Sequence, residues 1–302
     1  MRRTWLQISA CVLALAACQV SSSGNESQNA ATADPNNVAQ PSGAAVPVSL
    51  SRLDCGALHV NEMDKDFAGG AGVYPPGPHD LTDSCYLIRH GDQMMIWDAG
   101  FPEFLVGHPM RDPDQTATLD RSLADELKAG GVDPAKVSFV GISHYHGDHT
   151  GQAHFFPNAT LLIGAQDLAA LKAKSDNQFM QMSQKQLAHW LTDGGKIEAV
   201  TGDKDVFGDG SLIMLDLPGH TPGHHSLLVK LKSGDVLLTG DLYHGTEARQ
   251  KRGVPPFNTD KAQTLKSMDK FEALARQTGA KVVIQHERAD IPLLPAFPKA
   301  AE

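Results

Sequence analysis

The segment that most restricts how this chain can fold is Ser143–Gly151, SHYHGDHTG, which holds three histidines and an aspartate within six residues. It continues directly from Lys136–Ser143, KVSFVGIS, whose apolar residues predict a buried strand. The histidines therefore come at the C-terminal end of a strand, a position where folds of alternating strands and helices commonly place reactive side chains. Imidazole and carboxylate groups at this density are typical ligands of one or two zinc-like ions.

The spacing within this run separates its ligands into two pairs. His144 and His146 lie on one side of an extended segment, because side chains alternate along it. Gly147 permits a turn that points Asp148 and His149 in another direction. We therefore expect one metal ion on the first pair and a second ion on the other pair. The alternative is a polar loop that binds no metal.

Other potential ligands in the chain disfavour that alternative. His220 lies in LPGHTPGHHS, Asp241 in LLTGDLYH and His286 in VVIQHE, and each comes just after a predicted strand. The neighbouring His224 and His225 are interpreted as residues that do not bind metal, as are the histidines outside these motifs. The set predicts a metal centre built from several strand ends.

The remaining pattern from Ser49 onward alternates strands and helices, which indicates a mixed α/β fold with helices covering sheets. Cys85–Gly100 predicts two strands around a turn at Gly91-Asp92. Thr116–Gly131 predicts a helix with leucines on one face, and a second helix is expected from about Asp260 to Gln277. Further strands are expected in ATLLIGA, SLIMLDLPG, HSLLVKL, DVLLTGD and KVVIQHE.

The N-terminus predicts export from the cytoplasm. Arg2 and Arg3 precede the apolar run Trp5–Ala17, which is too short to span a bilayer and is typical of a secretory signal. Leu15–Cys18, LAAC, resembles the lipobox of bacterial lipoproteins, in which the cysteine becomes the lipidated first residue. The residue directly after Cys18 is Gln19, which is not acidic, so the resemblance favours the outer membrane over the inner one and implies an outer-membrane, periplasmic or secreted protein. Ordinary signal cleavage and a short buried helix are the alternatives.

Three segments follow from this interpretation. Residues 1–17 are expected to be a signal peptide, residues 18–47 a flexible tether with almost no large apolar side chain, and residues 48–302 the folded domain. Loss of two arginines with the signal leaves 24 basic residues against 35 acidic ones, a net charge of −11. Such a charge argues against a nucleic-acid partner. Cys55 and Cys85 remain in an oxidising compartment, either bridged or both reduced and buried.

Taken in order, the motifs between about residues 85 and 287 resemble those of the metallo-β-lactamase superfamily. This resemblance implies an αβ/βα sandwich with a metal site between two sheets. It also implies two Zn²⁺ ions, with Mn, Fe or Co as other possible metals, and hydrolysis by water that the ions activate. By motif position, the resemblance implies that His144, His146 and His220 bind one ion and that Asp148, His149 and His286 bind the other. It also implies that the Asp241 carboxylate bridges both ions and that Asp98 supports the ligands.

Within the superfamily, the flanks GDLYHGTEARQKRGVPPFNTDKAQTLKSM and SCYLIRHGDQMMIWDAGFP resemble the N-acyl-homoserine lactonase group. This likeness implies a small-molecule lactone substrate, Asp148 as a proton acceptor and Tyr243 as a substrate contact, although the lactonases place that tyrosine one position later, where this chain has His244. An apolar wall for the acyl chain is expected in Phe179–Leu191. Zinc β-lactamases are the main alternative, followed by other secreted ester or lactone hydrolases and an inactive metal-binding protein.

Overall fold

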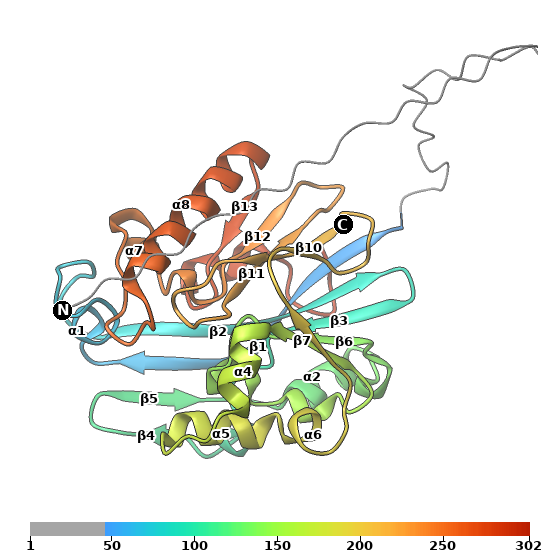
Figure 1. The fold of residues 1–302 in the computed structure, drawn as a ribbon, viewed down its shortest axis with the longest axis horizontal. Coiled ribbons are helices and arrows are strands. Elements are labelled where there is room, and N and C mark those ends of the chain that lie inside the picture. The colour runs from blue at the N-terminus through green and yellow to red at the C-terminus, as the bar shows by residue number, and fades with distance from the viewer. Residues whose placement is uncertain (1–45) are drawn as a thin grey trace, which may run out of the picture. The chain divides into compact units, whose positions relative to one another are not determined.

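The computed structural model describes residues 46–302, which form one compact unit (Figure 1). The expected signal peptide, the lipidated Cys18 and the tether up to residue 45 lie outside the described residues, so these remain predictions. No helix of residues 46–302 has the length and apolar character needed to cross a membrane.

Two sheets form the centre of the fold. The larger sheet has eight strands in the order β4-β5-β1-β2-β3-β6-β7-β8, and the smaller has five in the order β13-β12-β11-β10-β9. The strands of the larger sheet are β1 (Val48–Val60), β2 (His79–His90), β3 (Gln93–Trp97), β4 (Met110–Arg111), β5 (Gln115–Thr118), β6 (Phe139–Gly141), β7 (Thr160–Gly164) and β8 (Ile197–Val200). Those of the smaller sheet are β9 (Lys204–Asp205), β10 (Leu212–Asp216), β11 (His225–Val229), β12 (Val236–Leu238) and β13 (Lys281–Val283).

The helices are mostly short and lie outside or beside the sheets (Figure 1). The α-helices are α1 (Met63–Ala68), α2 (Leu123–Ala129), α3 (Gly147–Thr150), α4 (Ala165–Lys172), α5 (Gln178–Gln186), α6 (Ala188–Leu191), α7 (Thr246–Lys251) and α8 (Lys261–Thr278). Short 3₁₀ helices are η1 (Glu103–Leu105), η2 (Pro134–Lys136), η3 (Ala153–Phe155), η4 (Gly240–Leu242) and η5 (Arg288–Leu293).

Three apolar clusters establish the layer order. Leu50 and Trp97 of the larger sheet and Leu227 of the smaller sheet belong to one buried cluster between the two sheets. Helices α2 and α4 pack on the outer face of the larger sheet. Helix α8 packs on the outer face of the smaller sheet through Met268 and Phe271. Burial of both faces of each sheet explains why the strands contain so many apolar residues, and the result is the expected αβ/βα sandwich.

Two expectations about the larger sheet can now be compared with the structure. The helix predicted over Thr116–Gly131 is wrong at its start, because β5 ends at Thr118 and α2 begins only at Leu123, where the Ser122 hydroxyl accepts a hydrogen bond from the Asp125 N–H. Cys55 of β1 and Cys85 of β2 are joined by a disulfide, so the structure favours the bridged form of this pair.

Candidate metal centre

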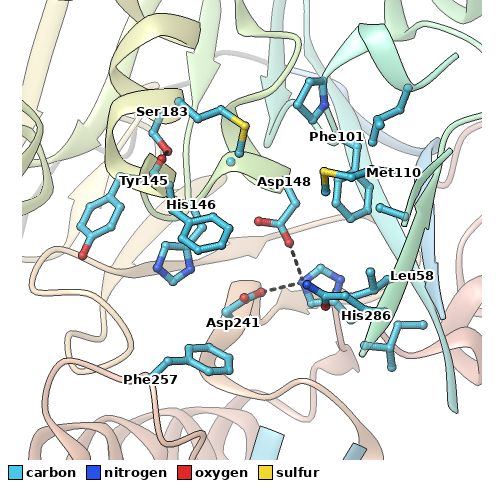
Figure 2. Close-up of a pocket in the computed structure, with 18 of the residues that line it drawn as sticks. Leu58, Phe101, Met110, Tyr145, His146, Asp148, Ser183, Asp241, Phe257 and His286 are labelled. Atoms are coloured by element: carbon cyan, nitrogen blue, oxygen red, sulfur yellow. Dashed lines mark hydrogen bonds and ion pairs between the residues drawn. The ribbon is translucent and has the colours of Figure 1, made fainter. Parts of the chain in front are cut away.

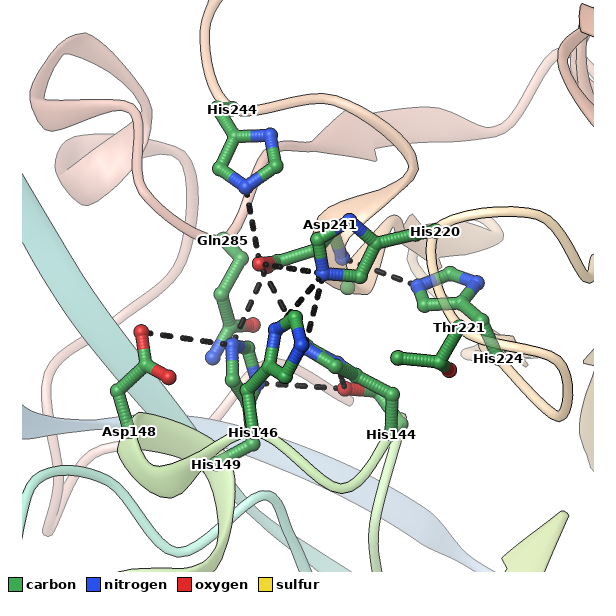
Figure 3. Close-up of polar contacts among 12 residues, drawn as sticks. His144, His146, Asp148, His149, His220, Thr221, His224, Asp241, His244 and Gln285 are labelled. Carbon is green, nitrogen blue, oxygen red and sulfur yellow. Dashed lines mark hydrogen bonds and ion pairs between the residues drawn. The ribbon is translucent and has the colours of Figure 1, made fainter. Parts of the chain in front are cut away.

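The predicted ligands lie at the ends of four strands, around one point at the edge of both sheets (Figure 3). His144 and His146 follow β6, His220 follows β10, Asp241 follows β12 within η4, and His286 follows β13. Short α3 carries Asp148 and His149 directly after the first pair. Segments far apart in the sequence therefore bring all seven predicted ligands together.

Each of four ligand histidines is oriented by a hydrogen-bond partner at its Nδ1 atom, which leaves Nε2 free to face the centre. These Nδ1 contacts are His144 to Ser143 Oγ at 3.0 Å, His149 to Asp98 Oδ2 at 3.0 Å, His220 to Asn258 Oδ1 at 2.9 Å and His286 to the Thr82 carbonyl at 2.9 Å.

The first group of ligands consists of His144, His146 and His220. His220 Nε2 lies 3.0 Å from His144 Nε2 and 3.1 Å from His146 Nδ1. Burial lowers the pKa of all three imidazoles, and for His146 to about 4, so they are neutral near pH 7. Neutral imidazole nitrogens that converge in this way present lone pairs to a common point, which is the arrangement that a cation needs.

The second group consists of Asp148, His149 and His286. Asp148 Oδ2 lies 3.9 Å from Nε2 of each histidine. Within each group, the donor atoms lie within 4.8 Å of one another, and Asp241 meets the same limit together with the first group. The structure therefore divides the ligands in the same way as the sequence motifs do.

Asp241 lies between the two groups and directs one oxygen toward each of them. Oδ2 is 3.4 Å from His220 Nε2, whereas Oδ1 is 3.2 Å from His149 Nε2 and 3.0 Å from His286 Nε2. Burial alone would raise the pKa of Asp241, but the imidazoles of His149 and His286 hold it well below its usual range. An ionised carboxylate in this position can bridge two cations.

The donor set fits two divalent ions. His149 Nε2 and Asp241 Oδ1 are buried, and although they lie 3.2 Å apart, neither atom makes a contact with hydrogen-bond geometry among the described residues. Buried polar atoms are rarely left without a partner in folded proteins. Five imidazoles with two carboxylates suit zinc and related metals, and each ligand atom that lacks a partner points into the centre.

A second layer of contacts holds the ligands in place. Asp98 follows β3 with a positive φ of 58°, accepts a hydrogen bond from the Ser143 N–H at 2.7 Å through Oδ1, and contacts His149 through Oδ2. Such a backbone conformation costs about 1–3 kcal/mol in a residue other than glycine, so the surrounding contacts must stabilise it. The supporting position assigned to Asp98 agrees with this geometry.

His224 supports Asp241, a contact that the sequence did not indicate. The Asp241 backbone N–H donates to His224 Nε2 at 3.0 Å, and His224 Nδ1 contacts the Leu217 carbonyl at 3.0 Å. Burial lowers the pKa of His224 to about 3, so its ring stays neutral and keeps the tautomer that both contacts require. The only sequence signal was its position four residues after His220.

The structure does not place Tyr243 at the metal centre, so the role expected for this residue does not match the geometry. Its side chain is 1% exposed, packs against Phe271 and donates its hydroxyl hydrogen bond to Glu272 at 3.1 Å. His244 faces the centre instead, with Nε2 3.0 Å from Asp241 Oδ2. The backbone after η4 is extended, so the side chains of Tyr243 and His244 point to opposite sides. The side chain of His244 is the one that meets the ligands.

A cavity of about 500 Å³ opens onto the ligands (Figure 2). Asp148, Asp241 and His286 form its floor together with His146 and His244, and most of the remaining lining is apolar. Of the wall expected in Phe179–Leu191, Phe179, Met180 and Met182 line the cavity, whereas Leu187 and Trp190 are buried in the core. Additional apolar lining comes from segments that the sequence did not single out, including Leu58, Leu81, Phe101, Phe104, Leu105, Met110, Ala117 and Phe257.

Comparison with known proteins gives consistent results. Residues 80–286 match the model of the metallo-beta-lactamase superfamily. The chain is 34% identical over 278 residues to the N-acyl homoserine lactonase AttM of Azorhizobium caulinodans, covering 84% of this chain and 97% of that protein. It is 33% identical to the AttM lactonase of Rhizobium johnstonii, covering 80% of this chain and 94% of that protein.

Solved structures share the fold at lower identity. A quorum-quenching N-acyl homoserine lactone hydrolase superposes with a TM-score of 0.69 at 21% identity, covering 85% of this chain and 99% of its own. The dizinc quorum-quenching lactonase AidC, solved with the product N-hexanoyl-L-homoserine, superposes with a TM-score of 0.64 at 18% identity, covering 85% of this chain and 91% of its own.

Proposed function

Because the chain belongs to the metallo-beta-lactamase superfamily, we propose that it is a dimetal hydrolase that opens the lactone ring of N-acyl homoserine lactones. The observation that carries this proposal is Asp241, which directs one carboxylate oxygen toward each ligand group at the floor of a largely apolar cavity. Relatives that share a third of their residues with this chain over most of its length are N-acyl homoserine lactonases by name.

Two divalent cations held by these residues would polarise the lactone carbonyl and lower the pKa of water, and we propose that they are zinc ions. The chain's own contribution is to fix the positions of the ligands. Asp241 sets the separation of the two groups, and the contacts of Asp98 and His224 keep His149 and Asp241 from turning away.

Asp148 is the proton carrier in this proposal. Its side chain is 26% exposed and lines the cavity, unlike the fully buried His149 beside it. A carboxylate at the cavity surface can take a proton from water and pass it to the alcohol oxygen that leaves when the ring C–O bond breaks. One water is consumed, and the product is the open-chain N-acyl homoserine.

His244 is the substrate contact in place of Tyr243. Its ring lines the cavity, lies 5.7 Å from His286 with nearly parallel planes, and packs against Phe67 at 5.0 Å. These contacts hold Nε2 next to Asp241, where an N–H can donate a hydrogen bond to an oxygen of the bound lactone. The apolar lining around it would take the acyl chain.

The test is hydrolysis of a panel that contains acyl homoserine lactones of several chain lengths, simple esters and the β-lactam nitrocefin, together with elemental analysis of the purified protein. We expect lactones to be the best substrates and two zinc ions to be present per chain. Efficient cleavage of nitrocefin without lactone cleavage would replace this proposal with a β-lactamase.

We also propose that the protein is a lipoprotein of the bacterial envelope, anchored through Cys18 with its catalytic domain in the periplasm or at the outer membrane. The support is the LAAC sequence and the tether composition. Cys18→Ser should move the protein from the membrane fraction to the soluble fraction. Wild-type protein that is already soluble would refute the anchor.

A further inference from the structure

Asp167 is a fully buried carboxylate outside the metal centre that no step above uses. It lies in the first turn of α4, on the outer face of the larger sheet. Oδ2 accepts a hydrogen bond from the Thr221 hydroxyl at 2.7 Å, and Oδ1 accepts one from the Gly223 N–H at 2.6 Å.

Both donors belong to a segment that carries one ligand of the first group, because Thr221 follows His220 directly. The histidines of the first ligand group come from two loops, which we call the 143–149 loop and the 219–225 loop. Asp167 holds the 219–225 loop. That loop in turn contacts the 143–149 loop, because the His225 N–H donates to the Ser143 carbonyl at 2.8 Å.

Close packing supports the same connection. A Cβ atom on Gly223 would lie 2.6 Å from the Asp167 backbone nitrogen, and one on Gly164, just before α4, would lie 2.0 Å from the Gly223 carbonyl oxygen. The start of α4 thus rests directly on the 219–225 loop, with no space for a side chain between them. The loop backbone can reach the carboxylate only because glycines occupy these positions.

We propose that Asp167 is a positioning residue that fixes the 219–225 loop on the start of α4 and so sets the place of His220 relative to His144 and His146. The inference deepens the proposed function and rests on it only where activity is measured. It concerns the first ligand group most directly, because the 219–225 loop carries His220 and none of Asp148, His149 and His286.

A purely structural role is the competing explanation, since a carboxylate in the first turn also stabilises a helix. The two explanations differ in what they predict for the metals. Loss of helix stability would weaken both ligand groups or neither. Loss of the loop connection should weaken the first group selectively, because removal of residues that orient metal ligands typically costs 10–100-fold in affinity.

The experiment is a titration of the metal-free full-length chain with Co²⁺, followed by visible absorption, in Asp167→Asn and the wild type. His220→Ala and His286→Ala identify the spectra of the first and second groups. Glu126→Gln is the matched control. Glu126 is also buried and accepts a hydrogen bond from a backbone N–H, that of Asp54 at 3.1 Å, but this contact involves neither loop.

We expect Asp167→Asn to bind Co²⁺ about 10–100-fold more weakly at the first group and normally at the second, with Glu126→Gln unchanged at both. Thr221→Val removes one donor while keeping the side-chain shape, and should weaken the first group several-fold. If Asp167→Asn weakens Co²⁺ binding at both groups by the same factor, or at neither group, the proposal is overturned. If Asp167→Asn does not fold, an unchanged first group in Thr221→Val would overturn it.

The metal titration also separates this inference from the proposed function. Selective loss of Co²⁺ affinity in a protein whose wild type ignores lactones would support the positioning role of Asp167 and refute the lactonase proposal. If the wild type cleaves lactones and Asp167→Asn binds Co²⁺ at both groups as the wild type does, the lactonase proposal is supported and the positioning role of Asp167 is refuted.

Discussion

The metal centre and the cavity above it are built in different ways. The ligand histidines His144, His149 and His220 are at most 1% exposed, and hydrogen bonds with Ser143, Asp98 and Asn258 fix their rings. The cavity mouth, in contrast, is formed by Phe104 and Phe179, whose exposed fractions are 58% and 72%.

This difference reflects what each region must do. A metal ligand displaced by about 1 Å can cost on the order of 100-fold in rate, so the centre needs directional contacts. Apolar contact has little directionality, and a wall of aromatic and Met side chains can adapt to acyl chains of different length. Substitutions in the centre should therefore change metal content and turnover, and substitutions in the mouth should change substrate preference.

The largest effect is expected for Asp241→Ala. Among residues 46–302, Asp241 is the one carboxylate that faces both ligand groups, so without it repulsion between the two cations is less compensated and their positions shift. We expect lactone hydrolysis to fall by at least about 100-fold, with less metal bound per chain. Activity assays in metal-saturated buffer and elemental analysis provide the measurement. A variant that keeps two ions and near-normal activity would show that Asp241 does not bridge.

A smaller loss is expected for His224→Ala, which removes the acceptor for the Asp241 N–H. Residues of this kind typically contribute 10–100-fold to metal affinity or activity, and we expect a decrease within that range. His225→Ala is the matched control, because His225 is equally buried but contacts the carbonyls of Gly223 and Gly202 instead. Equal losses in the two variants would mean that general destabilisation explains the effect.

The same contrast explains what the sequence could predict. The seven ligands were recognisable because each follows an apolar strand and because glycines flank the His220 motif. The mixed α/β class followed from the alternation of strands with helices, and the αβ/βα sandwich followed from the resemblance to the superfamily. Asp167 gave no such signal, since a single aspartate in a helix has many uses and only the folded chain shows which loops it touches.

The points that the sequence missed or left open each have a specific structural cause. Leu119, Leu123 and Leu127 suggested one helix face, but Leu119 packs with Phe101 and Leu105 in a separate cluster before α2 begins. Which of two adjacent residues faces the centre after Asp241 depends on the single turn η4, which residue type does not reveal. The open question of Cys55 and Cys85 depended on the pairing of β1 with β2, a long-range contact.

His244→Phe sharpens the comparison at the boundary between centre and cavity. The ring shape is roughly kept while the N–H is lost, so a hydrogen bond to substrate worth about 1.5 kcal/mol would appear as a decrease of about tenfold in kcat/KM. Tyr243→Phe is the control, because the Tyr243 hydroxyl contacts Glu272 and should leave kcat/KM unchanged. A larger effect in Tyr243→Phe than in His244→Phe would restore the tyrosine as the substrate contact.

The smallest effect, and the one that isolates the cavity, is expected for Phe179→Ser. Phe179 lines the mouth from α5 and makes no contact with a ligand, so metal content and turnover of short-chain lactones should stay as in the wild type. A long acyl chain that covers this ring would lose apolar contact, and at roughly 25 cal/mol per Å² the loss of some tens of Å² corresponds to a several-fold rise in KM. Steady-state kinetics with a series of acyl chain lengths measures the difference, and Phe104→Ser in η1 shows whether the chain also covers that part of the mouth. If KM rises equally for short and long chains, the mouth does not receive the acyl chain. The adaptable wall that does receive it would then lie deeper in the cavity, closer to the rigid metal centre.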